Sequence, residues 1–110
     1  MTKVYSYLRT SADDGRDKAG LAVQREACEA YAARAGYEIV GEFAEDGVTG
    51  KLPMHSRPHG KLLIAALLGN CVKTVLTYDA KRIGRTQPAF WSFAGMCRDN
   101  GIAAVRCVRY

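Results

Sequence analysis

The order of strand-like and helix-like segments constrains this chain most. Short runs rich in β-branched and aromatic residues, typical of strands, alternate with stretches in which apolar residues recur at helical spacing. The expected strands are residues 4–9, 37–43, 72–76 and 102–108, and the expected helices are residues 21–35, 57–69 and 87–98. This alternating order predicts a three-layer α/β fold, a mostly parallel four-stranded sheet with helices on both faces. Right-handed crossovers favour the strand order 2-1-3-4.

Local signals mark the ends of the expected helices. Gly36 suits the position just after the first helix, Pro58 suits the first position of the second, and Thr86 suits the N-cap of the third. Residues 12–20 and 45–53 are rich in turn-forming types and are expected to be loops, the second of them mobile.

Length and composition bound the class of protein. The chain has 110 residues, 48% hydrophobic and 25% charged, which suits one compact soluble domain over residues 1–110. No apolar run approaches the roughly 20 residues of a membrane span, and the N-terminus lacks a signal-peptide pattern. Cys28, Cys71, Cys97 and Cys107 are widely spaced, which favours reduced, mostly buried thiols in a cytoplasmic protein over a zinc site or a disulfide framework.

Charge is distributed unevenly along the chain. The formal net charge is +5, with −3 in residues 1–50 and +8 in residues 51–110. A basic half on an otherwise balanced domain favours a polyanionic partner such as DNA.

Three cations, Lys81, Arg82 and Arg85, crowd the segment after the third expected strand. Because like charges repel and lose hydration beside a core, such a cluster needs an anion, and a phosphate matches the planar fork of arginine. In a 2-1-3-4 sheet the first and third strands are adjacent, and ligands bind beyond their carboxyl ends. Arg9 and Ser11 leave the first strand there, so we expect them to share a crevice with the cations. A solvated basic loop is the simpler interpretation of the cluster alone.

Gln24 falls on the inward apolar stripe of the first helix, with Leu21 and Cys28. A buried amide needs a polar partner, and the end of the first strand is the nearest source. A glutamine at the edge of the stripe that reaches solvent is the alternative.

A serine hydroxyl among arginines, without a glycine-rich phosphate cradle, suits attack on a phosphodiester. The arginines neutralise the charge of the transition state and of the leaving oxygen. Serine needs activation, and the sequence offers no obvious base near Ser11. His55 and His59 are expected to be solvated residues of the loop before the second helix.

The same residues form a set that resembles the catalytic domain of the serine recombinases, the resolvases and invertases. The matching segments, in the family's order, are residues 7–11 (Tyr-Leu-Arg-Thr-Ser), Gln24, and residues 46–50, 57–58 and 82–85. The resemblance implies a resolvase-like fold and a site-specific DNA recombinase in which Ser11 forms a 5′-phosphoserine intermediate. It also implies that the scissile phosphate is bound and activated by Arg9, Arg57, Arg82 and Arg85, with Gln24 supporting the site.

The resemblance implies partners as well as chemistry. The family works on DNA as dimers that pair into a tetramer and cut all four strands before exchange. It needs no metal and no other cofactor, because the covalent link keeps the bond energy.

Two features depart from the family's pattern. The family usually has an aspartate directly before the first arginine of the third-strand motif, where this chain has Lys81. A lysine repels Arg82 and Arg85, so we expect serine activation to suffer while phosphate binding survives. Asp79 replaces the missing acid only if the loop is shifted. Family members also continue into a dimerisation helix and a DNA-binding region, which nothing after Tyr110 supplies, so we expect little recombination by this chain alone.

Two other functions stay open at this point. One is a recombinase-like protein that binds DNA or a partner and has lost cleavage, as Lys81 permits. The other is a small α/β module that binds a soluble phosphate ligand in the same crevice.

Overall fold

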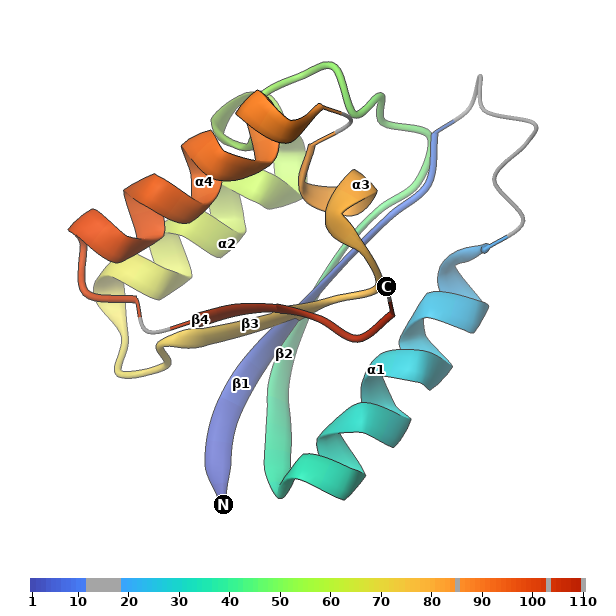
Figure 1. Ribbon diagram of the computed structural model, residues 1–110, viewed down its shortest axis with the longest axis vertical. Helices are drawn as coiled ribbons and strands as arrows, with labels where there is room; N and C mark the ends of the chain where they lie inside the picture. The colour runs from blue at the N-terminus through green and yellow to red at the C-terminus, as the bar shows by residue number, and fades with distance from the viewer. Residues whose placement is uncertain (12–18, 85, 103, 110) are drawn as a thin grey trace.

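A parallel four-stranded sheet in the order β2-β1-β3-β4 forms the centre of the fold (Figure 1). The computed structural model describes residues 1–11, 19–84, 86–102 and 104–109. The strands are β1 (Thr2–Arg9), β2 (Tyr37–Glu45), β3 (Thr74–Thr77) and β4 (Ala104–Cys107). The helices are α1 (Leu21–Ala35), α2 (Pro58–Gly69), α3 (Ala80–Ile83) and α4 (Gln87–Asp99), with a short 3₁₀ turn, η1, at Met54–Ser56. The predicted α/β class and strand order are confirmed.

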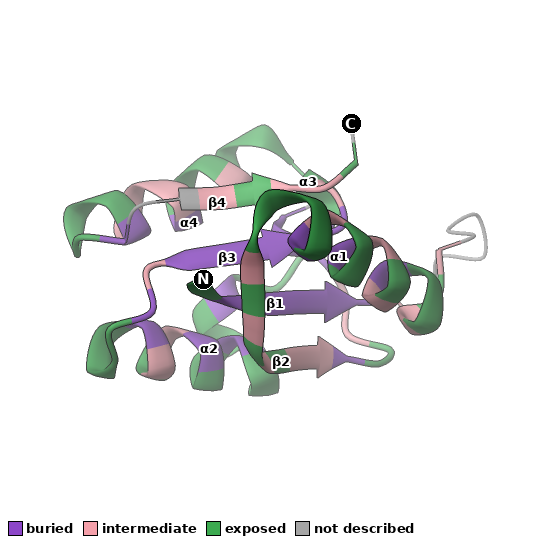
Figure 2. Cartoon of the chain, turned by 90° about the horizontal axis from the view of Figure 1, so that it is seen from below, coloured by how far each residue is buried: buried purple, intermediate pink, exposed green. Residues whose placement is uncertain are grey.

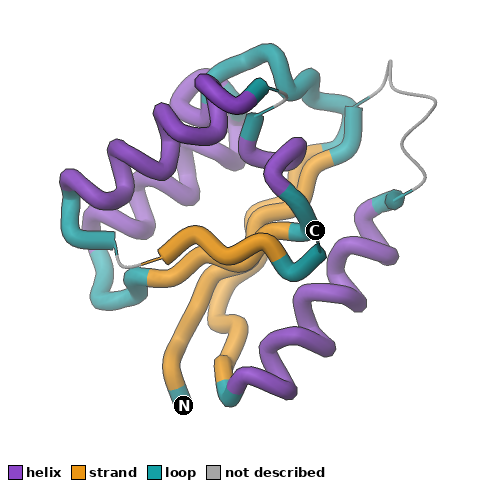
Figure 3. The backbone as a smooth tube through the Cα atoms, in the orientation of Figure 1, coloured by secondary structure: helices purple, strands orange, loops and turns teal. Residues whose placement is uncertain are grey.

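Helices cover both faces of the sheet. Successive side chains of a strand point to opposite sides, so each strand contributes residues to the packing on both faces. On one face Leu8 of β1 packs in a cluster with Cys28 of α1. On the other face Tyr7 of β1 belongs to a cluster with Leu63 of α2 and Phe93 of α4. Figure 3 shows α1 on one side of the strands and the other two long helices on the opposite side. The sheet is therefore the middle of three layers.

The central strands are more deeply buried than the edge strands (Figure 2). Residues 4–9 of β1 and all of β3 are buried. Strands covered on both faces have consecutive buried residues, whereas β2, at an edge, alternates between exposed and half-buried residues along most of its length. Because β1 and β3 are parallel neighbours in the sheet, their carboxyl ends lie next to each other.

The expected helix ends are observed. Gly36 has a positive φ of 74° and its N–H bonds to the carbonyl O of Ala32, which ends α1. Pro58 opens α2, and Thr86 Oγ1 accepts a hydrogen bond from Ala89 N at the start of α4. In the described part of the chain, no helix combines the length and apolar character needed to cross a membrane.

Several elements differ from expectation, among them β3, which covers Thr74–Thr77 instead of residues 72–76. β2 continues to Glu45, a residue expected in a loop. The cationic segment after β3 contains the single helical turn α3, closed by a bond from Gly84 N to the carbonyl O of Ala80 at 3.0 Å. β4 is shorter than expected, because Ile102 N bonds to the carbonyl O of Cys97 at 2.9 Å and so belongs to the end of α4.

The cysteines are free thiols in different environments. Cys28 and Cys97 are buried, Cys107 is half-buried and Cys71 is exposed, so the expectation of mostly buried thiols fails at Cys71. Burial raises the pKa of Cys28 to about 12 and that of Cys97 to about 11. Both thiols stay protonated, and thus poorly nucleophilic, at neutral pH.

Candidate active site at the ends of β1 and β3

Arg9 and Arg82 lie against each other at the carboxyl ends of β1 and β3. The strands pair in parallel as far as Tyr7 and Thr77, so they end at the same edge of the sheet. Arg9 donates from Nε to the carbonyl O of Arg82 at 3.2 Å, and Arg82 donates from Nη1 to the carbonyl O of Arg9 at 3.1 Å. Arg9 Nη2 also donates to the carbonyl O of Lys81 at 2.7 Å. The two segments that were predicted to meet are therefore joined by hydrogen bonds in both directions.

Arg57, the residue before α2, is the most fully engaged side chain of the site. Its guanidinium is completely buried, with 0% of the residue exposed. Its acceptors are the carbonyl O atoms of Arg82 (2.6 Å), Ile83 (2.7 Å), Leu52 (3.0 Å) and Gly50 (3.3 Å), Tyr7 Oη (3.1 Å) and Met54 Sδ (3.0 Å). A guanidinium has five N–H hydrogens, and these six acceptors, three of which share the two hydrogens of Nη1, leave none of its nitrogens without a partner. Arg57 fastens α3 and the segment before η1 to β1.

Glu45 is a buried residue of the site that the sequence analysis missed. Its carboxylate accepts hydrogen bonds from Tyr7 Oη at 2.6 Å, His59 N at 2.9 Å and Gly60 N at 3.2 Å. The last two are backbone N–H groups of the first turn of α2, where a negative charge is favourable. Burial raises the pKa of the Tyr7 hydroxyl, Arg57 opposes the shift, and the bond to Glu45 adds to it. In the sequence, Glu45 is only an acidic residue shortly after the expected strand 37–43, and nothing there indicates that it is buried.

Replacing Glu45 by glutamine is expected to lower the free energy of unfolding by about 2 kcal/mol. The amide keeps the shape but removes the charge from the α2 N-terminus, and hydrogen bonds to a charged group are worth roughly 1.5–3 kcal/mol. Urea denaturation measures the change. Glu38→Gln, at an exposed position of the same strand, is the matched control and should change stability by less than about 0.5 kcal/mol. Equal stability of the two variants would contradict this role for Glu45.

Of the two histidines expected in the loop before the second helix, His59 lies in that helix instead. His55 is exposed in η1, in the segment before α2. His59 lies in the first turn of α2, and its Nδ1 is 3.4 Å from Glu45 Oε1. The expectation that His59 is solvated is confirmed, since the residue is exposed, but its assignment to a loop is wrong because α2 begins at Pro58.

Gln24 has the polar partner that was predicted for it. Arg9 N donates to Gln24 Oε1 at 3.1 Å, and Gln24 Nε2 donates to the carbonyl O atoms of Arg9 and Ala19 at 3.0 and 2.8 Å. The side chain is buried, so the alternative of a glutamine reaching solvent is excluded. Gln24 fixes the backbone of the last residue of β1.

Ser11 follows β1 at the same sheet edge and is half-buried. The segment before it is held on the side of β2, where Thr10 N donates to the carbonyl O of Glu45 at 2.9 Å. Val48 N donates to the carbonyl O of Thr10 at 2.9 Å, and Arg9 Nη1 donates to the carbonyl O of Val48 at 2.8 Å. The loop after β2 thus braces the backbone that leads into Ser11.

Lys81 and Arg82 are neighbours in sequence with opposite environments. Arg82 is 1% exposed, whereas Lys81 is exposed. A carboxylate does lie beside Arg82, but it comes from Asp79, whose Oδ1 is 3.3 Å from Arg82 Nε. Arg85 lies outside the described residues, so its place in the crevice stays a prediction.

Three arginine side chains of the site are buried among the residues that the structure describes. Arg9, Arg57 and Arg82 are 3%, 0% and 1% exposed. Among the described residues that contact them, the carboxylates are Glu45, reached through Tyr7, and Asp79. Guanidinium groups match the geometry of phosphate oxygens. Three of them gathered at one sheet edge suit a phosphate ligand.

A comparison with known protein families shows which family the chain belongs to. The family described as "Resolvase, N terminal domain" matches residues 4–108. The chain belongs to the resolvase family. A comparison of the resolvase domain with curated proteins found no match.

Solved structures of serine recombinase domains share the fold of this resolvase domain. The N-terminal catalytic domain of TP901-1 integrase has a TM-score of 0.79 and 21% identity, over 94% of this chain and 76% of that one. The C-terminal catalytic domain of ISC1926 TnpA, an IS607-like serine recombinase, has a TM-score of 0.74 and 25% identity, over 97% and 70%. A resolvase family site-specific recombinase from Streptococcus pneumoniae has a TM-score of 0.73 and 23% identity, over 98% and 72%. The resemblance and the resolvase-like fold are confirmed.

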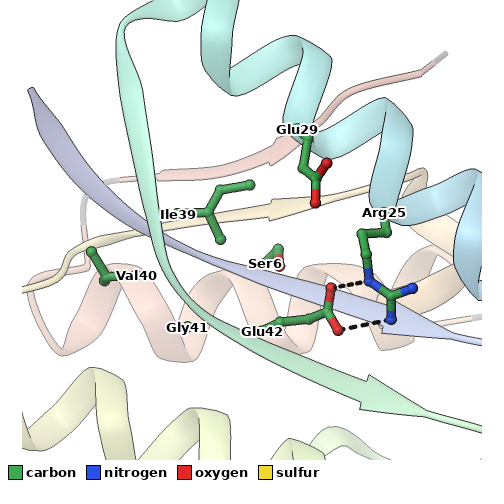
Figure 4. A pocket seen from close by; sticks show the side chains of 7 residues that line it. All are labelled: Ser6, Arg25, Glu29, Ile39, Val40, Gly41 and Glu42. Atoms are coloured by element: carbon green, nitrogen blue, oxygen red, sulfur yellow. Dashed lines mark hydrogen bonds and ion pairs between the residues drawn. The ribbon is translucent and has the colours of Figure 1, made fainter.

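A cavity of about 500 Å³ lies between α1 and β2 of the resolvase domain (Figure 4), and none of the arginines just described lines it. It is lined by Ser6, Arg25, Glu29, Ile39, Val40, Gly41 and Glu42. Arg25 is the cation of this lining, and it donates from Nε and Nη2 to the two carboxylate oxygens of Glu42 at 2.8 and 2.9 Å. A guanidinium neutralised in this bidentate way does not attract a phosphate. The candidate site therefore stays at the ends of β1 and β3.

Proposed function

We propose that this resolvase domain is the catalytic domain of a site-specific DNA recombinase in which Ser11 attacks a DNA phosphodiester. The observation that carries the proposal is the reciprocal pairing of Arg9 and Arg82 at the sheet edge from which Ser11 departs. A nucleophile beside buried arginines meets the main need of phosphoryl transfer, which is stabilisation of charge at the phosphate.

The proposed reaction is a transfer of the phosphoryl group from DNA to protein. The hydroxyl oxygen of Ser11 forms a bond to phosphorus while the bond from phosphorus to the 3′ oxygen breaks. The 5′ end of the cut strand stays on the serine, and the other strand end becomes a 3′ hydroxyl. Attack of a 3′ hydroxyl on the phosphoserine reverses the step and rejoins DNA, so the bond energy is kept and no cofactor is consumed.

The side chains of the proposed active site have different roles. We assign binding of the scissile phosphate to Arg9 and Arg82, together with Arg85. Arg57, whose donors are all engaged within the protein, is assigned to positioning, since it holds the carbonyls of α3. Gln24 is assigned to fixing the backbone of Arg9 through bonds of 3.1 and 3.0 Å.

The partners follow from the same proposal. DNA is the substrate, and the basic half of the chain, net +8 over residues 51–110, is its electrostatic footprint. Cutting and exchange of two duplexes call for several protomers, so we propose a dimer that pairs into a tetramer on DNA. A DNA substrate places the protein in the cytoplasm.

Covalent capture of nicked DNA tests the proposal. The protein is incubated with a pool of duplexes labelled at the 3′ end and randomised around a nick, from which the short upstream fragment dissociates after cleavage. We expect a labelled adduct that survives denaturing electrophoresis and carries its phosphate on Ser11 by mass spectrometry. DNA binding without an adduct would contradict the proposal and favour a recombinase-like binding protein. Binding of inorganic phosphate but not DNA would favour the soluble-ligand module.

DNA binding is expected to weaken steeply with salt. With three to five phosphate contacts, a plot of log affinity against log salt should have a slope of about −3 to −4.5. Fluorescence anisotropy of a labelled duplex measures the slope. Lys51→Ala, at an exposed position of the basic half, should make the slope shallower by about 1 if it contacts a phosphate, whereas Arg34→Ala in α1 should not. A flat plot would contradict a DNA footprint.

A further inference from the structure

A carboxylate that no sequence motif assigns lies beside the candidate active site. Asp79 is the residue before α3, and its Oδ1 lies 3.3 Å from Arg82 Nε. This oxygen is buried and makes no hydrogen bond with the described residues, so its interaction with Arg82 is an ion pair. A buried carboxylate oxygen is unfavourable unless a cation compensates it, and Arg82 is that cation.

The geometry of α3 explains why position 79, and not position 81, supplies the acid. Residues three apart on a helical turn are neighbours, whereas adjacent residues point in different directions. Asp79 and Arg82 are three apart and form the ion pair. Lys81 is adjacent to Arg82 and exposed. A carboxylate introduced at position 81 would lie on the exposed side of the turn, where Lys81 lies now.

Among the described residues, three groups contact the guanidinium of Arg82 and favour one direction for it. The ring of Tyr78 has its centroid 5.5 Å from Arg82 Cζ. The carbonyl O of Arg9 accepts from Nη1 at 3.1 Å, and Asp79 lies next to Nε. The charge of Asp79 also reaches Cys107 of β4, whose thiol pKa is raised by burial and then by Asp79. Asp79 is half-buried and lies close enough to both Arg82 and Cys107 for its charge to act on them.

We propose that Asp79 is a positioning residue, which holds the Arg82 guanidinium toward the end of β1 where the chain leads into Ser11. The inference rests on the proposed function, because the direction of Arg82 affects catalysis only if a phosphate is bound there. Asp79 at Nε and the Arg9 carbonyl at Nη1 fix two edges of the guanidinium plane. Without Asp79 the guanidinium loses the charged contact at its Nε edge. A misplacement of about 1 Å in such a group lowers a rate by as much as 10²-fold.

The test compares Asp79→Asn with a conservative variant, Asp79→Glu, and a matched control, Asp99→Asn, which alters an exposed aspartate at the end of α4. The rate of adduct formation is measured at saturating nicked DNA, on variants whose circular dichroism melts show a folded state. The Nε–H resonance of Arg82, assigned by its loss in Arg82→Lys, is followed by NMR without DNA. The second readout reports the ion pair independently of any reaction.

We expect Asp79→Asn to slow adduct formation by about 10- to 100-fold and to shift the Arg82 resonance. Asp79→Glu should recover part of the rate, and Asp99→Asn should leave both readouts at the wild-type values. An unshifted Arg82 resonance in Asp79→Asn, with a rate equal to the wild type, would overturn the inference. So would a rate that rises about tenfold in Lys81→Asp, which would show that an acid is needed at position 81. If the wild type forms no adduct, the proposed function fails, and the Arg82 resonance alone decides whether Asp79 holds the guanidinium.

Discussion

Ser11→Ala is expected to lower covalent adduct formation with nicked DNA by more than about 10³-fold, to below detection, while DNA binding persists. The hydroxyl is the group that bonds to phosphorus, and loss of a nucleophile removes a covalent step outright. The arginines that would attract the phosphate, Arg9 and Arg82, are buried side chains with backbone partners that the substitution does not touch. Denaturing electrophoresis measures the adduct, and fluorescence anisotropy measures binding.

Thr10 provides the matched control, because it carries the hydroxyl adjacent to Ser11 in sequence. Its Oγ1 donates to Asp46 Oδ1 at 3.0 Å and accepts from Gly47 N at 3.4 Å, so this hydroxyl serves the loop after β2. Thr10→Ala should keep the adduct. An adduct that survives Ser11→Ala but disappears in Thr10→Ala would assign the nucleophile to position 10 and contradict the proposed reaction.

The fold was predictable because its signals are local and repeat along the chain. β1 and β3 are covered on both faces, and both are short segments rich in β-branched, aromatic and aliphatic residues, which is the local signal of a buried strand. Glycine and proline mark the ends of α1 and α2 in the sequence. α3 was missed because a single turn has too few residues to show helical spacing. Glu45 was assigned to a loop because its burial depends on Tyr7 and on the first turn of α2, which come from distant parts of the chain.

The sequence predicted which segments meet at the candidate site, but not the hydrogen-bond partners of its side chains. Parallel pairing brings Arg9 to Arg82, and the apolar stripe of α1 brings Gln24 to the end of β1. The sequence does not reveal that Arg57 donates to backbone carbonyls, because every residue has such a carbonyl and no residue type marks it as an acceptor. Nor does it show that Asp79 rather than position 81 faces Arg82, because that depends on the helical turn formed there.

Arg57→Ala is expected to lower the free energy of unfolding by about 3–5 kcal/mol, the usual effect of removing one partner from a buried charged network. The carbonyls of Arg82 and Ile83, bonded to Arg57 at 2.6 and 2.7 Å, lose this donor, and a cavity is left behind. A domain of this size has a stability of about 5–15 kcal/mol, so the variant loses a large share of it. Urea denaturation measures the change, and Arg34→Ala at an exposed position of α1 should change it by less than about 0.5 kcal/mol.

A loss below about 1 kcal/mol would mean that other groups replace the donors of Arg57, and the role assigned to it would be wrong. Adduct formation separates positioning from direct contact with DNA. Trimethylamine N-oxide, an osmolyte excluded from protein surfaces, favours the compact state and should restore the folded population of Arg57→Ala. If Arg57 only positions α3, the refolded variant should regain part of its adduct yield, because Arg9 and Arg82 keep their own partners. A variant that is folded and still forms no adduct would instead place Arg57 at the phosphate. The full engagement of its donors within the protein favours the first outcome.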